Sequence, residues 1–304
     1  MKYIISDNTE ERHLKEKKYA YVAGLIDADG SLYISRSTNK IGYTSFDPTI
    51  MIRTTHLPTA KRLVKTFGGK YDESKWENDQ WKTYYRWKFT SDKEAFFFLD
   101  KISKYLWLKK EQAFVLKEYY ALNGSQNVDL RHKLTDKIQS LNQNESVTTN
   151  TSSLSNAYIA GMFDGEGSSY IIRVKQSKQS RGKGFYYRAT ISLGSTSKSL
   201  AETLKEKFGG SWRERPPHNG NLPMYEWCLQ DNMSKEKFLL AVLPYLITKV
   251  RQSKIVLDFV RLNKLPNPET RKAMWIECSA LNGKKIESDL IGDNKSESVV
   301  IQNS

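Results

Sequence analysis

Two pairs of acidic residues, each closing an apolar segment, are the strongest candidates for chemistry. The pairs are Asp27 with Asp29 and Asp164 with Glu166. The apolar spacing before each pair is helical, so the acids fall in a last helical turn, where the dipole disfavours a carboxylate by roughly 0.3 to 1 kcal/mol. Two carboxylates brought together resist joint ionisation unless a cation neutralises them. The pattern predicts a hard divalent cation, Mg²⁺, at Asp29 and Glu166. Asp27 and Asp164 are expected instead to bond backbone N–H groups and fix the turn into the first strand.

An internal repeat positions these pairs. Tyr21–Ser31 recurs as Tyr158–Ser168, and further landmarks recur in the same order at a nearly constant offset. They are Phe67-Gly68-Gly69 with Phe208-Gly209-Gly210, Tyr85-x-Trp87 with Tyr225-x-Trp227, and Lys109-x-x-Gln112 with Lys249-x-x-Gln252. The sequence therefore predicts an N-terminal extension (1–18), a first copy (19–141), a linker (142–156), a second copy (157–283) and a disordered tail (284–304).

Each copy predicts an α+β fold with the element order αββαββα. In the first copy the motif helix is followed by strands over 32–37 and 44–54, a helix that opens after Pro58 and ends before Gly68, a hairpin, a strand over 84–90, and helices over 92–103 and 108–122. A further helix is expected over 268–281, matching 128–141. Short connections between strands imply antiparallel sheets with helices on one face. Gly24 and Gly161 each cost about 1 kcal/mol in a helix, which predicts close packing of the two motif helices about a pseudo-twofold axis.

Composition narrows the functional classes. The 304 residues carry 48 Lys and Arg against 34 Asp and Glu, a net charge of +14 that favours a polyanionic partner. The two cysteines and four dispersed histidines offer neither a disulfide framework nor a zinc site. The longest apolar stretch, Phe238–Ile247, is shorter than the roughly 20 residues that span a bilayer. No signal or transit pattern is visible at residues 1–18, so an intracellular protein is expected, with organelle, prokaryotic and phage hosts all open.

The two motifs, their spacing and the repeat body resemble the LAGLIDADG homing endonucleases, in their intron-encoded, single-chain, two-motif form. The resemblance covers residues 19–263 and implies a monomer whose motif helices form the interface between two halves and whose sheets form a saddle on double-stranded DNA. It implies that the acid at the eighth motif position binds divalent metal together with the preceding carbonyl, here Asp29 with Ala28 and Glu166 with Gly165. The implied reaction is hydrolysis of one phosphodiester in each strand across the minor groove, leaving short 3′ overhangs.

The resemblance also assigns a catalytic role to two lysines. Lys109 and Lys249 occupy the place where the family keeps a lysine near the scissile phosphate. The sequence departs from the family where the second strand ends: a Gln or similar polar residue is frequent there, whereas this chain has Thr54 and Ser195.

Alternation along the strands assigns outward residues to DNA. In the first copy these are Tyr33, Ser35, Ser37, Arg53, Tyr84, Arg86 and Lys88. In the second copy, with Tyr170, Ile172 and Val174 inward, they are Arg173, Lys175, Arg188, Thr190 and Ser192. Arg213 and Arg215 are expected in loops as phosphate contacts.

Two alternative functions stay open on the same scaffold. One is an intron RNA maturase, with intron RNA as a partner. The other is a sequence-specific DNA-binding protein without catalysis. Loss of catalysis usually removes an eighth-position acid, and this chain keeps both.

Overall fold

A computed structural model describes residues 6–75, 82–122, 127–144, 153–175, 185–217, 222–262 and 268–283, with side chains from residue 16. Residues 145–152 of the predicted linker, and the whole of the predicted tail, lie outside these residues. The helices are α1 (Ser6–Asp29), α2 (Leu57–Phe67), α3 (Asp92–Ile102), α4 (Lys110–Tyr120), α5 (Val128–Gln143), α6 (Asn156–Glu166), α7 (Lys198–Phe208), α8 (Asn232–Val242), α9 (Val250–Arg261) and α10 (Pro268–Leu281). The strands are β1 (Gly30–Thr38), β2 (Thr44–Thr54), β3 (Lys70–Ser74), β4 (Tyr84–Lys88), β5 (Gly167–Lys175), β6 (Phe185–Ser195), β7 (Ser211–Arg215) and β8 (Met224–Cys228).

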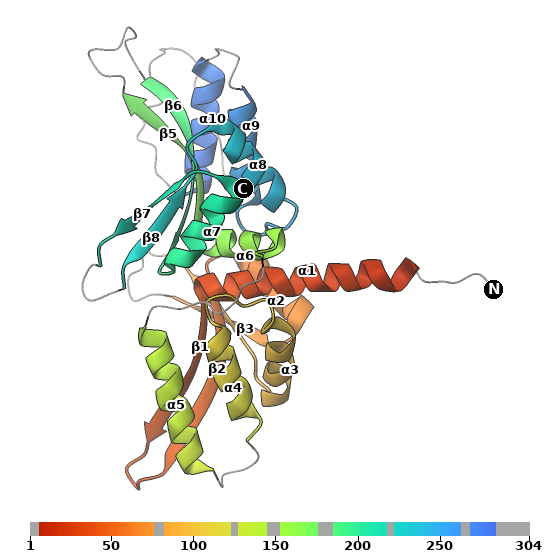
Figure 1. Ribbon diagram of the computed structural model, residues 1–304, viewed down its shortest axis with the longest axis vertical. Helices are drawn as coiled ribbons and strands as arrows, with labels where there is room; N and C mark the ends of the chain where they lie inside the picture. The colour runs from red at the N-terminus through yellow and green to blue at the C-terminus, as the bar shows by residue number, and fades with distance from the viewer. Residues whose placement is uncertain are drawn as a thin grey trace, which may run out of the picture. The chain divides into compact units, whose positions relative to one another are not determined.

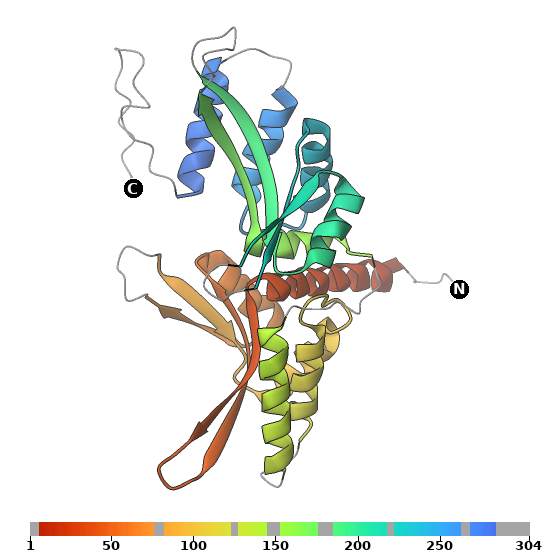
Figure 2. The same ribbon diagram turned by 60° about the vertical axis from the view of Figure 1, so that its left-hand side comes forward.

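Two four-stranded sheets confirm the predicted α+β class and the duplication. Their strand orders, β1-β2-β4-β3 and β5-β6-β8-β7, correspond strand by strand. In the first sheet β1 pairs with β2, and β4 pairs with both β2 and β3, all antiparallel. Helices α2, α4 and α5 pack against this sheet, and α3, α4 and α5 lie together on one side of it (Figures 1 and 2).

Local sequence explains where the helices begin and end. The Ser155 hydroxyl accepts a hydrogen bond from the backbone N–H of Tyr158 and so caps the N-terminus of α6. Gly68 and Gly209 end α2 and α7 with φ of 82° and 80°, a left-handed conformation that glycine adopts without a steric penalty. The predicted helix over 268–281 is α10.

Equivalent tryptophans lie in the buried core of both copies. Trp87 and Trp227 are fully buried, and their indole N–H groups donate to the carbonyls of Gly68 and Gly209 at 2.9 and 3.0 Å. Each tryptophan therefore ties a central strand to the turn after a helix, which satisfies a buried polar atom inside the apolar core.

Packing divides the chain into two compact units. One contains Met1–Ser168 and Ile191–Val250; the other contains Ser169–Thr190 and Arg251–Ser304. Helix α1 begins at Ser6, so the motif helix continues back into the predicted N-terminal extension (Figure 1). Among the helices that the structure describes, none combines the length and the apolar character that crossing a membrane requires.

Candidate cation site and nucleic-acid interface

Helices α1 and α6 pack closely within the first unit, as the two glycines predict. A Cβ atom on Gly24 would lie 2.0 Å from the carbonyl oxygen of Tyr158, and one on Gly161 would lie 2.0 Å from that of Tyr21. No side chain can occupy either position without separating the helices. The close approach sets the C-terminal ends of both helices next to each other.

The first acid of each motif is buried and binds backbone N–H groups. Asp27 accepts hydrogen bonds from the N–H groups of Trp107, Leu108 and Lys109 at 2.7, 3.0 and 2.9 Å, and from the Tyr158 hydroxyl at 2.7 Å. These N–H groups precede helix α4 and lack intrahelical partners, so a carboxylate there satisfies them.

Asp164 of α6 makes the equivalent bonds to the N–H groups that precede α9. It accepts hydrogen bonds from the N–H groups of Ile247, Thr248 and Lys249 at 2.6, 3.1 and 2.8 Å, and from the Tyr21 hydroxyl at 2.7 Å. Both acids bond backbone N–H groups, as predicted. The location differs, because they hold the starts of α4 and α9 rather than the turn into the first strand.

Tyr21 and Tyr158, whose hydroxyls bond these acids, were not predicted as site residues from the sequence. Tyr21 and Tyr158 each reach across the helix pair to the acid of the opposite motif. Burial raises the pKa of both phenols well above the ordinary value, and the nearby carboxylates raise it further. A signal was present, because both tyrosines open the repeated segment at equivalent positions.

Lys109 binds the C-terminal end of the first motif helix. Its ammonium group donates to the carbonyls of Ile26, Asp27 and Gly30 at 2.8, 3.0 and 2.8 Å. The last carbonyls of a helix lack intrahelical partners, and a cation there also opposes the negative end of the dipole. Burial lowers the pKa of the amine, while Asp27 and Asp29 raise it.

Lys249 caps the second motif helix in the same way. Its ammonium donates to the carbonyls of Phe163, Asp164 and Gly165 at 2.9, 2.5 and 2.8 Å. Burial also lowers the pKa of this amine, opposed by Asp164 and Asp29. The two lysines therefore have a structural function at the helix ends, beside the acids with which they were predicted to act.

The second acid of each motif is exposed. Asp29 and Glu166 end α1 and α6, and a Cβ atom on Gly165 would lie 3.1 Å from Oδ2 of Asp29. Although both side chains keep exposed surface, the crowded helix ends remove part of the surrounding water and raise the pKa of both carboxyls. Asp29 raises the pKa of Glu166 further, and the two lysines oppose the rise.

These donors suit Mg²⁺. Within the described part of the chain no group of three or more His, Cys, Asp or Glu side chains could hold a metal. Magnesium is commonly bound by one or two carboxylates, with water and substrate phosphate completing its shell. The Gly165 carbonyl already accepts from Lys249, but an oxygen has two lone pairs and can accept a second partner.

A cavity of about 480 Å³ connects Asp29 to the sheet. Its lining includes Asp29, Lys249, Arg53 and Tyr84. The Arg53 guanidinium lies 5.0 Å from the centre of the Tyr84 ring, on the side of the sheet opposite the buried Ile52 and Trp87. The cavity joins the exposed acid to a cationic and aromatic strand face.

The first sheet presents the predicted outward residues on one side. Leu32, Ile34 and Trp87 are buried, so the alternating positions point the other way. The half-buried or exposed side chains there are Tyr33, Ser35, Ser37, Tyr84, Arg86 and Lys88. Arg86 Nε also pairs with Asp72 Oδ1 at 2.7 Å.

The register predicted for β5 is wrong. Ile171 is 2% exposed, so it points inward together with Ser169 and Arg173. The Arg173 guanidinium stacks on Phe185 at 3.6 Å and lies 5.6 Å from the Trp275 ring of α10. The predicted register would leave Ile171 exposed, whereas Trp275 of α10 lies over Arg173 on the same face of the strand as Ile171. Lys175, which shares the Arg173 face, is exposed at the strand end.

The remaining residues of the second copy divide into two groups. On β6, Ala189, Ile191 and Leu193 are buried, which leaves the predicted outward side to Arg188, Thr190 and Ser192. Arg213 and Arg215, however, lie on β7 and not in a loop. Both donate to the same oxygen of Glu226, at 2.8 and 2.7 Å. These bonds hold the pKa of Glu226 below its ordinary value, although partial burial alone would raise it.

The polar residues that end β2 and β6 cap turns. The Thr54 hydroxyl accepts from the N–H of His56, and the Ser195 hydroxyl accepts from that of Ser197, both at 3.1 Å. Each bond stabilises the turn before α2 or α7.

Two family models match the chain. A family model described as LAGLIDADG endonuclease matches residues 159–265, and one described as LAGLIDADG-like domain matches residues 16–103. A comparison with curated proteins finds no match.

Solved structures share the fold. Meganuclease I-SmaMI bound to uncleavable DNA is 18% identical, covers 88% of this chain and 98% of its own, and superposes with a TM-score of 0.67. LAGLIDADG homing endonuclease I-GzeII in complex with its DNA target is 15% identical, covers 86% and 97%, and gives 0.65. I-SmaMI bound to cleaved DNA is 21% identical, covers 87% and 95%, and gives 0.63.

Proposed function

Because the chain belongs to the LAGLIDADG endonuclease family, with two such domains, we propose that it is a site-specific DNA endonuclease that requires a divalent cation and leaves a staggered break in both strands. The observation that carries this proposal is the pair of exposed acids, Asp29 and Glu166, at the adjacent ends of α1 and α6. The similar structures bound to DNA support double-stranded DNA as the substrate.

The protein's part in the reaction is to hold oxygen donors in fixed positions. Asp29 and Glu166, with the carbonyls of Ala28 and Gly165, would hold Mg²⁺ or another divalent cation. Such an ion, when bound, makes water a stronger nucleophile and stabilises charge on the attacking and leaving oxygens. The buried bonds of Asp27 and Asp164 keep the helix ends in place, so the exposed acids need no rearrangement to bind.

Lys109 and Lys249 add positive charge beside the acids. Each ammonium is fixed by three carbonyl oxygens, so its charge has a defined position from which it attracts the scissile phosphate. We propose that they act in cleavage through this field and through the helix ends that they hold.

Recognition of the target is assigned to the strand faces. Arg53, Tyr84, Arg86 and the polar residues of β1 can bond base edges and phosphates, as can the outward residues of β6. Arg213 and Arg215 both form ion pairs with Glu226, so these side chains would have to rearrange to contact phosphate.

The test is cleavage of a randomised or host-locus DNA library with Mg²⁺, followed by sequencing of the ends. The wild type is compared with Asp29→Asn/Glu166→Gln and with Glu73→Gln/Glu214→Gln, which removes two exposed acids at equivalent positions of β3 and β7. We expect one recurrent site with staggered ends for the wild type and the control, and none for the first variant or with EDTA.

Two results would contradict the proposal. Cleavage that survives in Asp29→Asn/Glu166→Gln would remove these acids from the reaction. Retention of one sequence without any cut by the wild type would instead favour the catalytically silent DNA-binding protein or the RNA maturase.

A further inference from the structure

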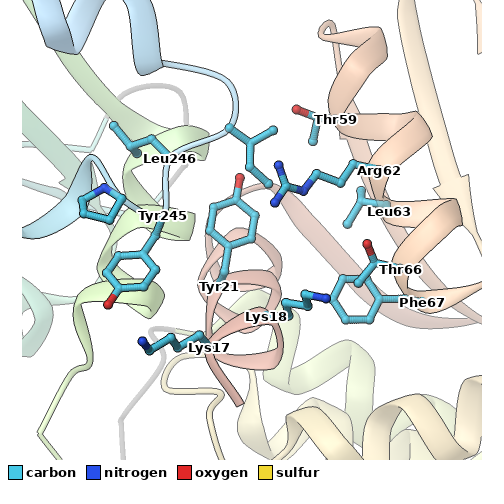
Figure 3. Close-up of a pocket in the computed structure, with 12 residues that line it drawn as sticks. Lys17, Lys18, Tyr21, Thr59, Arg62, Leu63, Thr66, Phe67, Tyr245 and Leu246 are labelled. Carbon is cyan, nitrogen blue, oxygen red and sulfur yellow. The ribbon is translucent and has the colours of Figure 1, made fainter. Parts of the chain in front are cut away.

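A second cavity of the first unit has a charged and aromatic lining. It has a volume of about 360 Å³ and lies between α1, α2 and the segment that connects α8 to α9. Its cations are Lys17, Lys18 and Arg62, and its rings are Tyr21, Phe67 and Tyr245. Figure 3 shows Tyr21 between Tyr245 on one side and Arg62 on the other, with Lys17 near the Tyr245 ring. None of these residues lines the cavity beside Asp29.

The cations of this cavity are available for a ligand. Lys17 Nζ lies 6.0 Å from the centre of the Tyr245 ring, and within the described residues neither Lys18 nor Arg62 forms an ion pair. The lining contains no acidic side chain. Three cations gathered without an acid repel one another, so an anion that binds among them relieves an unfavourable arrangement.

The residues at the corresponding positions of the second copy are different. Leu154, at the position equivalent to Lys17, is only 5% exposed. Lys207, equivalent to Thr66, donates to the Leu154 carbonyl at 2.5 Å, and Thr203 replaces Arg62. The difference arises because α1 continues back to Ser6, whereas α6 begins at Asn156. The cationic cavity is therefore not a consequence of the shared repeat.

We propose that this cavity binds a nucleotide, with its phosphate on Lys18, Arg62 and Lys17 and its base against the Tyr245 or Phe67 ring. Aromatic rings beside a cationic track are the combination that binds nucleotides in single strands, because every base has a face that stacks. The volume lies in the range of small-molecule sites. Leu63 and Leu246 add apolar wall that inorganic phosphate would not use.

The substitutions that test ligand binding must leave the folded core intact. Tyr21 holds Asp164 and Thr59 is bonded to Thr248, so neither is changed. Lys18 and Arg62 are exposed and can be truncated. Lys61→Ala/Lys65→Ala removes the same charge from two exposed positions of α2 outside the cavity lining and serves as the control.

The experiment is calorimetric titration of the full chain with adenosine 5′-monophosphate, adenosine and inorganic phosphate. We expect the monophosphate to bind more tightly than either part, and Lys18→Ala/Arg62→Ala to weaken it at least about tenfold while the control is unchanged. Equal binding to the wild type and the variant, or no binding of the monophosphate, would overturn the proposal.

A second variant tests the stacking face, and a competition identifies the source of the nucleotide. Tyr245→Leu should weaken binding of the monophosphate but not of inorganic phosphate. Tyr105→Leu, at the equivalent position of the first copy, should change neither affinity. An equal loss of monophosphate binding in the two variants would contradict stacking at Tyr245. Displacement of the monophosphate by a 5′-phosphorylated single strand identifies a strand end as the ligand, and its absence identifies a free nucleotide.

Discussion

The two copies agree at the motif helices and differ on the strands. At the helix pair, each tyrosine bonds the acid of the opposite motif at 2.7 Å, each acid binds three successive N–H groups, and each lysine caps three carbonyls. On the sheets, an ion pair is kept at equivalent register positions with its charges reversed. The acid lies on β3 as Asp72 and the arginine on β4 as Arg86, whereas Arg213 lies on β7 and Glu226 on β8.

The difference shows what constrains each region. At the helix pair, buried donors and acceptors must all be satisfied and the backbones leave no space for a side chain, so one solution serves both copies. On the exposed strands an ion pair contributes little to stability, so its polarity is free to follow the bound surface. A DNA target with two unlike halves requires such divergence on the strands and not at the helices.

The largest effect is expected where the helices approach most closely. Gly24→Ala places a Cβ atom 2.0 Å from the Tyr158 carbonyl oxygen, so the helices must separate. We expect a loss of about 3 kcal/mol or more in the free energy of unfolding, measured by denaturant titration. Gly194→Ala is the control, since its Cβ would meet only the flexible Met224 side chain at 3.2 Å. Equal stability of the two variants would show that close packing is not what fixes the helix pair.

The next largest effect separates the two acids of one motif. Asp27→Ala leaves three backbone N–H groups and the Tyr158 hydroxyl without their acceptor, so the free energy of unfolding should fall by about 3 kcal/mol. Asp29→Ala should change it by less than about 1 kcal/mol while cleavage is lost. Thermal unfolding and a cleavage assay on the same samples measure both. A stable Asp27→Ala protein would refute the structural assignment.

A smaller effect concerns pH and cations. The pKa of Asp29 and of Glu166 is raised in the folded chain, so between about pH 4 and that raised pKa the unfolded state binds fewer protons and stability falls as pH rises. In metal-free buffer at pH 7, Asp29→Asn/Glu166→Gln should therefore raise the unfolding temperature by about 2 °C. Glu73→Gln/Glu214→Gln should leave the unfolding temperature unchanged.

Added Mg²⁺ should stabilise the wild type and the control but not Asp29→Asn/Glu166→Gln. An unfolding temperature lowered by the first variant would contradict the electrostatics described above.

The smallest effect on stability tests the reversed ion pair. Asp72→Arg/Arg86→Glu gives the first copy the polarity of the second and should change the free energy of unfolding by less than about 1 kcal/mol. The base preference of the first half of the target should nevertheless change, as sequencing of cleaved library members would reveal. An unchanged preference would mean that these strand positions do not face DNA.

The sequence predicted most of the fold because the repeat carries the same information twice. The motif acids, the close-packing glycines and the helix over 268–281 all depend on local residue types and spacing. The β5 register failed because period-two alternation does not distinguish Ile171 from Ile172 without knowledge of what covers each face. Trp275, distant in sequence, decides it.

The sequence indicated which type of group the site residues would bond, but not which particular residues would supply it. The sequence indicated that Asp27 would bond backbone N–H groups, but not that these belong to Trp107–Lys109, because that pairing depends on how α4 packs. The lysine caps at the helix ends were likewise hidden, since a lysine at the start of one helix gives no sign that it reaches the end of another.

We propose that the second acid of each motif, and not the first, holds the divalent cation. Crystals of the chain with its DNA target, grown with Mn²⁺ in place of Mg²⁺, would locate the ions by anomalous scattering. We expect anomalous peaks beside the carboxylates of Asp29 and Glu166 and none beside Asp27 or Asp164. Peaks at the buried acids, or their absence from both exposed ones, would contradict it.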